Sequence, residues 1–269
     1  MLQHSDVIGV MATRHLNEQG CVDLLTSNER LRWEAIRNEE RRKGWLGGRL
    51  AAKYQFIAAL GGGATDAGSS WRPRLCSLDA ALLEDFPRWA YREIEVLPPP
   101  CTRVGAPQLS WIGCPQSVCV SLSHTAGLTC ACLTDAVPVW LDVEIPRRRD
   151  PAFYRGNFSR SERRWAETLC RSESVDPDRV YTLLWCLKEA ALKSRRSAEV
   201  NVLQVPLIEI QPICPASALS GILRPGQPGT ALLNAQVKIR HAGRIGTAEA
   251  AIAASAQAIL VALRVQEED

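Results

Sequence analysis

Residues 137–145, near the middle of the chain, alternate between aliphatic and other side chains, and Pro146 follows shortly after the last acidic residue. The positions between the aliphatic residues hold Trp140, Asp142 and Glu144. A period of two places alternate residues on opposite faces of an extended segment, and proline does not continue a β-ladder. The pattern therefore predicts a β-strand with two carboxylates on one face, which excludes a purely helical fold.

Helical segments are predicted on both sides of this strand. Thr26 and Glu29 have the spacing of a capping box, and so do Ser159 and Glu162. Apolar residues three or four apart continue the helical pattern in both halves. The predicted helices span 25–43, 45–60, 159–171 and 176–193.

Further strands are expected in both halves as well. The predicted strands span 118–124, 128–133, 202–210, 231–239 and 258–265, the first two forming a hairpin. This alternation of strands and helices predicts a mixed α/β (α+β) fold. No internal repeat is evident in the sequence, but two similar halves fit the pattern. We expect an N-terminal module at 1–137 and a C-terminal module at 138–269 that holds most metal and catalytic residues.

Composition narrows the classes of partner. The net charge is only +3 over 269 residues, which favours neither nucleic acid nor a membrane surface as a partner. The first residues have no basic start followed by an apolar run, and no stretch of roughly 18 apolar residues occurs. The ten cysteines are therefore interpreted as reduced and mostly buried, and we expect a soluble cytoplasmic protein.

Two short patterns carry most of the predicted chemistry. Asp142 and Glu144 lie roughly 6–7 Å apart along a strand and can share one hard cation such as Mg²⁺. Glu189 and Lys193 are one helical turn apart, with Lys188 beside them. One interpretation is an exposed Glu–Lys pair. The other is a third carboxylate for a metal, with two ammonium groups that neutralise phosphates.

The remaining polar motifs are less specific. Ser123 and His124 end a predicted strand, but no Ser–His–acid triad can be assembled around them. Arg41 and Arg42 form either a solvated helix face or a phosphate clamp. The cysteines near His124 have no Cys-x-x-Cys pair, so core cysteines are favoured over a zinc site.

Taken in order, these motifs resemble the 4′-phosphopantetheinyl transferases of the surfactin-synthetase-activating type. The resemblance spans residues 25–195 and includes Phe158-Ser-x-x-Glu162 between the last two motifs. The four main motifs are Arg41-Arg42-x-x-Trp45-Leu-x-Gly48-Arg49-x-x-x-Lys53, Ser121-x-Ser123-His124, Asp142-x-Glu144, and Trp185-x-x-Lys188-Glu189-Ala190-x-x-Lys193.

The resemblance implies a fold and a reaction. It implies a pseudo-two-fold pair of modules, each a small sheet with packed helices, with coenzyme A in the cleft between them. A serine of an acyl or peptidyl carrier protein would attack the β-phosphorus of coenzyme A, take 4′-phosphopantetheine and release 3′,5′-ADP. Mg²⁺, replaceable by Mn²⁺, would assist, and the family precedent suits a monomer.

The resemblance also implies roles for individual residues. The metal would be held by Asp142, Glu144 and Glu189, with Glu189 or a water taking the serine proton. Phosphate charge would be balanced by Lys188 and Lys193. The 3′-phosphate would be gripped by His124 with Arg41, Arg42 or Lys53, and Ser123 belongs to the same coenzyme-binding motif.

Two further expectations concern pocket and partner. Trp140 stands where the family has glycine, and strand alternation predicts that it lines the coenzyme pocket. Residues 147–164 hold seven arginines against Asp150 and Glu162, which favours docking of an acidic carrier protein. The alternative function is a catalytically weakened relative that binds coenzyme A or a carrier protein without efficient transfer.

Overall fold

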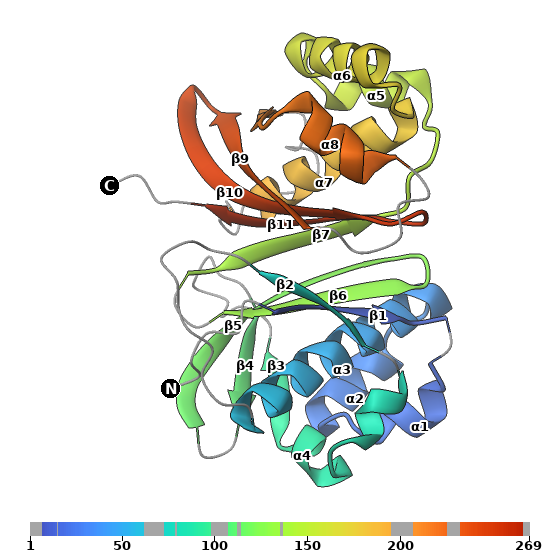
Figure 1. Ribbon diagram of the computed structural model, residues 1–269. Helices are drawn as coiled ribbons and strands as arrows, with labels where there is room; N and C mark the ends of the chain where they lie inside the picture. The colour runs from blue at the N-terminus through green and yellow to red at the C-terminus, as the bar shows by residue number, and fades with distance from the viewer. Residues whose placement is uncertain are drawn as a thin grey trace. The chain divides into compact units, whose positions relative to one another are not determined.

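The computed structural model divides the chain into two compact units, Met1–Leu141 (unit 1) and Asp142–Asp269 (unit 2). Both units combine a β-sheet with packed helices (Figure 1), which confirms the predicted mixed α/β class. The described residues are 7–14, 16–61, 73–78, 80–97, 107–111, 114–134, 137–194, 207–224 and 232–265.

Within the described residues, six strands form the sheet of unit 1, in the order β2-β1-β6-β5-β4-β3. Among the strand pairs that the structure describes in this sheet, only β1 and β2 pair in parallel. The hairpin expected near residue 125 is confirmed by the antiparallel pairing of β5 with β6. The strands are β1 (Val7–Ala12), β2 (Arg74–Leu78), β3 (Ile94–Leu97), β4 (Gln108–Trp111), β5 (Cys114–Thr125) and β6 (Leu128–Thr134).

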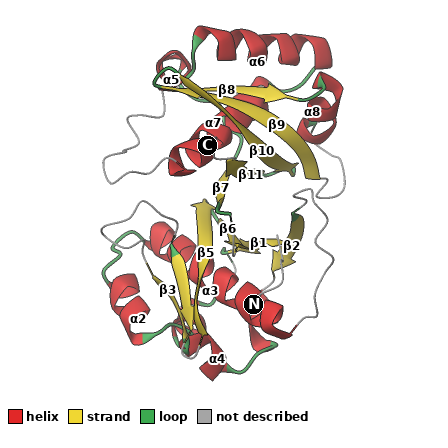
Figure 2. Cartoon of the chain, turned by 90° about the vertical axis from the view of Figure 1, so that its left-hand side faces the viewer, coloured by secondary structure: helices red, strands yellow, loops and turns green. Residues whose placement is uncertain are grey.

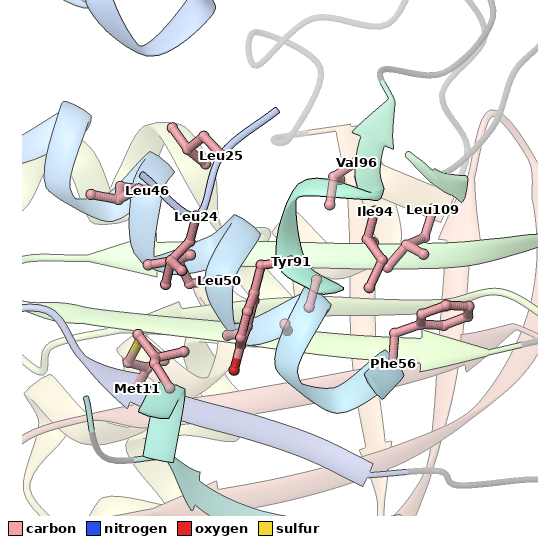
Figure 3. Packing of buried hydrophobic residues seen from close by; sticks show 14 of the residues in the cluster. Met11, Leu24, Leu25, Leu46, Leu50, Phe56, Tyr91, Ile94, Val96 and Leu109 are labelled. Atoms are coloured by element: carbon pink, nitrogen blue, oxygen red, sulfur yellow. The ribbon is translucent and has the colours of Figure 1, made fainter. Parts of the chain in front are cut away.

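The long helix α3 carries much of the core of unit 1 against this sheet. Leu46, Leu50 and Phe56 of α3 are fully or almost fully buried, and Figure 3 shows them grouped with Tyr91 and Ile94. The α-helices of this unit are α1 (Glu18–Val22), α2 (Ser27–Glu34), α3 (Glu39–Gly61) and α4 (Arg88–Arg92), with a 3₁₀ turn, η1 (Ala80–Glu84).

The expected break between the first two helices lies elsewhere in the structure. The predicted helix 25–43 ends at Glu34, and α3 then runs without interruption through Gly44. Asn38 Oδ1 accepts a hydrogen bond from Arg41 N at 2.8 Å, so it satisfies a donor at the start of α3. Gly44 remains inside the helix because its missing side chain leaves room for His124.

Among the described residues of β7 to β11, the sheet of unit 2 has the order β7-β11-β10-β9-β8. Helix α7 packs against β11 and β8, and α6 packs against α7 (Figure 2). The strands are β7 (Val139–Glu144), β8 (Ile208–Ile213), β9 (Leu232–His241), β10 (Arg244–Ala254) and β11 (Ile259–Val265). The helices are α5 (Pro151–Asn157), α6 (Arg160–Glu173), α7 (Pro177–Ser194) and α8 (Ala216–Leu223).

Several strands were missed or displaced in the sequence analysis. The strand expected at 202–210 begins at Ile208, and its first part, 202–206, lies outside the described residues. Strand β10 went unrecognised because its alanines have weak β-propensity, whereas in the fold it pairs with β9 and β11 along its length. Strands β1 to β4 were not predicted either.

Helix α7 is fixed at its N-terminal end by a buried arginine. Arg179 donates to the carbonyl oxygens of Leu223, Ser255 and Ala256, and it is 3% exposed. These acceptors lie at the end of α8 and in the turn between β10 and β11. The guanidinium therefore joins α7 to the end of α8 and to the β10–β11 turn through three backbone carbonyl groups.

The described residues contain no helix that is long and apolar enough to cross a membrane. The cysteines whose side chains the structure describes are all free thiols, four of them buried.

Two neighbouring glycines of α3 should respond in opposite ways to alanine. A Cβ at Gly47 would lie 2.5 Å from Thr13 Cγ2, whereas one at Gly48 would meet nothing closer than 3.5 Å. We expect Gly47→Ala to lower the free energy of unfolding by about 1–3 kcal/mol through overpacking. Gly48→Ala should raise it by about 0.5–1 kcal/mol, because alanine favours the helix. Urea unfolding of both variants checks this, and equal effects would contradict the close packing at Gly47.

Candidate active site

Strand β7 ends with the two carboxylates singled out in the sequence. Asp142 is 6% exposed, and its Oδ1 accepts a hydrogen bond from Lys193 Nζ at 2.9 Å. Glu144 is half-buried, and its Oε2 lies 3.6 Å from Arg149 Nη2. Burial raises the pKa of Glu144, and the negative charge of Asp142 raises it further, against the opposing effect of nearby cations. The end of β7 therefore concentrates negative charge that cations neutralise.

One face of α7 lies toward these carboxylates. Lys193 donates a hydrogen bond to Asp142, and the negative charge of Asp142 also acts on the thiol of Cys186. Burial raises the pKa of Cys186 well above its ordinary value, with the carboxylates of Asp142 and Glu144 adding to the effect. Glu189 lies three residues after Cys186 and four before Lys193, so it belongs to the same helix face.

The carboxylates at the end of β7 and on α7 are candidate ligands for a divalent cation. Within the part of the chain that the structure describes, no three His, Cys, Asp or Glu side chains are grouped closely enough to form a metal site as they stand. The available donors are nevertheless carboxylate oxygens, the ligands that Mg²⁺ prefers. The ammonium of Lys193 on Asp142 marks a position where positive charge is stabilised. In donor chemistry and charge, these residues fit a hard cation.

Lys188 lies in a different environment from Lys193. Its side chain is 0% exposed, and Nζ bonds to Glu162 Oε2 at 2.9 Å and to Asn157 O at 2.6 Å. The ammonium also lies 5.3 Å from the centre of the Phe158 ring. Burial lowers the pKa of Lys188, and Glu162 counteracts that shift. This ammonium group therefore does not reach the protein surface.

Lys53 of unit 1 is enclosed in the same manner. Its ammonium donates to Glu29 Oε2, to Leu24 O and to Tyr91 O, and both charged side chains are 0% exposed. Burial lowers the pKa of Lys53, and the carboxylate of Glu29 opposes the shift. Three acceptors thus occupy the three donor positions of an ammonium group.

The other coenzyme-binding candidates of unit 1 lie around the N-terminal half of α3. The exposed His124, near the end of β5, packs on Gly44, where a Cβ would lie 2.6 Å from His124 Cδ2. Arg41 lies one helical turn before Gly44 and is exposed, whereas Arg42 Nε bonds to Glu18 Oε2 at 3.0 Å. The structure therefore brings His124 next to the start of α3.

Ser123 and the two candidate tryptophans contribute to packing. Ser123 and Trp140 are buried, at 7% and 9% exposure. Trp185, which the sequence analysis named only as part of a motif, lies with its ring centre 5.0 Å from that of Phe153 on α5. This contact holds α5 against α7. The guanidinium carbon of Arg149 lies over the Phe153 ring as well, 4.8 Å from its centre.

Three positions have roles that the sequence analysis did not assign. Ser121 Oγ accepts the backbone N–H of Leu141 at 2.8 Å, which fixes β7 directly before Asp142. Its place in the Ser-x-Ser-His motif was the available signal. Glu29 was recognised only as a capping residue, and Glu162 as a cap and as part of the Phe158-Ser-x-x-Glu162 segment, yet each also binds a buried lysine. No sequence pattern distinguishes such a partner from an ordinary helix cap.

Comparison with known proteins adds one finding. No curated protein matches the chain. Residues 139–238, which run from β7 into β9 and make up less than half of the chain, match the model of the 4′-phosphopantetheinyl transferase superfamily. The segment that carries the β7 carboxylates and helix α7 is therefore similar to 4′-phosphopantetheinyl transferases, and this likeness supports a transferase of that superfamily.

Proposed function

We propose that the protein transfers 4′-phosphopantetheine from coenzyme A to a serine of an acyl or peptidyl carrier protein. The observation that carries this proposal is the pairing of Asp142 on β7 with Lys193 on α7. Glu189 lies four residues before Lys193 and therefore on the same helix face. The superfamily match over this segment supports it. We assign the chain to the two-module, surfactin-synthetase-activating type, with modules at 1–137 and 138–269.

The residues of unit 2 suit phosphoryl transfer. In the reaction, the serine Oγ forms a bond to the β-phosphorus while the bond from that phosphorus to the oxygen of 3′,5′-ADP breaks. Glu189, or a water beside it, accepts the serine proton. Lys193 balances negative charge on the phosphate oxygens, which is the chief contribution a protein makes to such a reaction.

Asp142, Glu144 and Glu189 are proposed to hold Mg²⁺, or Mn²⁺ in its place. When bound, the cation would neutralise pyrophosphate charge and orient its oxygens. Lys193 then contributes its positive charge to the phosphates instead of to Asp142.

Unit 1 is proposed to recognise the 3′-phosphate through His124 and Arg41. Both side chains are exposed. Arg41 lies in the first turn of α3, and His124 packs on Gly44 of the same helix. Arg42 is paired with Glu18, and its guanidinium lies 4.9 Å from the Trp33 ring centre. We therefore assign Arg42 a structural role at the start of α3 and not a contact with the 3′-phosphate.

The arginines that follow β7 are proposed to form the docking surface for an acidic carrier protein. Arg147 and Arg148 are exposed, whereas Arg149 bonds to Glu144. Glu162 does not offset these cations at the surface, because it is buried and paired with Lys188. The excess of positive charge in this segment therefore stays as the sequence count indicated, because the pairing of Arg149 with Glu144 offsets the pairing of Glu162 with Lys188.

The transfer and its carboxylates are tested together by intact mass of apo-carrier proteins incubated with the protein, coenzyme A and Mg²⁺. We expect addition of phosphopantetheine, and a loss of rate of at least about 100-fold in Asp142→Asn and Glu189→Gln. Glu167→Gln, on the exposed side of α6, serves as the control and should leave the rate unchanged. Coenzyme A binding without any mass change would instead support the catalytically weakened relative.

Recognition of the 3′-phosphate is tested with His124→Ala. We expect its KM for coenzyme A to rise about 10-fold, equivalent to ~1.4 kcal/mol of lost binding. With dephospho-coenzyme A, which lacks the 3′-phosphate, the variant and the unchanged protein should have the same KM. His241→Ala provides a matched control. An equal loss with both coenzymes would place His124 elsewhere than at the 3′-phosphate.

The docking surface is tested by the double variant Arg147→Glu/Arg148→Glu. Its KM for carrier protein should rise while its KM for coenzyme A stays constant, because opposite surface charges guide encounter. The effect should shrink at high salt, since exposed charges are screened beyond roughly 8–10 Å at physiological ionic strength. Arg171→Glu/Arg244→Glu changes the net charge equally at other exposed positions of unit 2. Equal effects of the two double variants would refute a local docking site.

A further inference from the structure

Unit 1 contains a buried polar assembly that joins three elements. Glu29 completes the capping box of α2, where its Oε2 accepts from Thr26 N at 3.1 Å. Glu29 Oε1 accepts from Val96 N, on β3, at 3.0 Å. Lys53 of α3 binds the same carboxylate and the carbonyl of Leu24, two residues before the cap. One ion pair thus ties a helix start, a strand and a second helix together.

Unit 2 contains a corresponding assembly in which these four contacts recur. Glu162 completes the capping box of α6, where its Oε2 accepts from Ser159 N at 2.7 Å. Glu162 Oε1 accepts from Ile210 N, on β8, at 2.8 Å. Lys188 of α7 binds the carboxylate and the carbonyl of Asn157, which again lies two residues before the cap.

The elements that meet in the two assemblies also correspond. Helices α2 and α3 of unit 1 match α6 and α7 of unit 2 in order, and the lysine follows its glutamate by 24 and 26 residues. Strands β3 and β8 each lie at the end of the described strand order of their sheet. An end strand has a neighbouring strand on one side only. In both units the carboxylate therefore accepts a backbone N–H on the side of the end strand where the described sheet has no further strand.

The direction of Lys188 on α7 separates it from the candidate active site. An α-helix turns by roughly 100° per residue, so Lys188 and Lys193 project about 140° apart. Lys193 points to Asp142 on β7, whereas Lys188 points to the start of α6. A phosphate bound beside Lys193 would have to reach through the helix to contact the buried ammonium of Lys188.

We propose that Lys188 and Lys53 are positioning residues and not phosphate ligands. Each fixes its helix to the capped helix and edge strand of its own unit. In unit 2 this fixes the part of α7 that carries Glu189 and Lys193, a consequence for catalysis that rests on the proposed function. The corresponding assembly of Glu29 and Lys53 in unit 1 fixes α3, which carries Arg41 and contacts His124. We call each of these two assemblies a lock.

The proposal is tested by removing one partner or both. Lys188→Met leaves the Glu162 carboxylate buried without its cation, so we expect the unfolding midpoint to fall by about 10 °C or more. The double variant Glu162→Gln/Lys188→Met is neutral and keeps an acceptor for Ile210 N but loses the one for Ser159 N, so it should recover part of that loss. Lys53→Met and Glu29→Gln/Lys53→Met form the matched pair in unit 1 and should behave alike.

A binding measurement separates positioning from contact with phosphate. Calorimetric titration with 3′,5′-ADP should give the neutral double variant of unit 2 a Kd within about 3-fold of the unchanged protein. Lys193→Met should weaken binding by about 10-fold or more, as expected for loss of a charged contact. A stable double variant that binds as weakly as Lys193→Met would overturn the proposal, because Lys188 would then contact the nucleotide.

The unfolding measurements do not depend on the proposed activity. If single and double variants have equal midpoints, the locks are not structural, whatever reaction the protein performs. If the unchanged protein neither binds 3′,5′-ADP nor modifies carrier proteins, the proposed function fails, while the midpoints still decide the structural role of both lysines. Where Lys188→Met does not fold, its recovery by Glu162→Gln in the double variant supports the lock.

Discussion

A carboxylate and an ammonium group that are both removed from water stabilise a protein only when every remaining donor and acceptor is satisfied. In unit 2 the Glu162 carboxylate meets this condition through Ser159 N, Ile210 N and Lys188, whose ammonium also binds Asn157 O. The Glu29–Lys53 pair meets it in the same way. Since a single missing partner would leave a buried charge, the surrounding elements are held to one arrangement.

Helix α7 consequently has two sides with different tasks. Toward α6, Lys188 takes part in a closed set of buried bonds, and Arg179 adds three carbonyl acceptors near the helix start. Toward β7, Lys193 and Glu189 accompany two carboxylates, and burial, together with the negative charge of Asp142, raises the pKa of Glu144. A rigidly held helix allows these charged groups to stay close together without relaxing apart, which is a condition for preorganised catalysis.

In unit 1, two glycines of α3 fix the position of the helix by letting neighbouring side chains approach its backbone closely. Gly44 leaves room for the ring of His124, and Gly47 leaves room for Thr13. Thr129 Oγ1 also donates to the carbonyl oxygen of Gly44 at 3.1 Å, so β6 is bonded directly to this part of the helix. The exposed His124 is thereby placed against Gly44 of α3, one helical turn after Arg41, although the two segments are about 80 residues apart in the sequence.

The sequence by itself determined the local features whose cause is local. Strand β7, the β5–β6 hairpin, both capping boxes and helix α7 follow from alternation, turn residues and cap chemistry, and the structure confirms them. The two carboxylates of β7 and the Glu189–Lys193 face of α7 could be named for the same reason. Strand β10 could not, because its alanines become a strand only through pairing with β9 and β11.

The tertiary structure alone decided which lysines are buried and which partner each one takes. Lys188 and Lys193 look equivalent in the sequence, since both are cations in the last turns of one helix. Long-range packing places Lys188 against Glu162, 26 residues away, and Lys193 against Asp142, 51 residues away. Burial and ion pairing depend on segments distant in the chain, so no local pattern can distinguish the fully buried Lys188 from Lys193, which pairs with a carboxylate of β7.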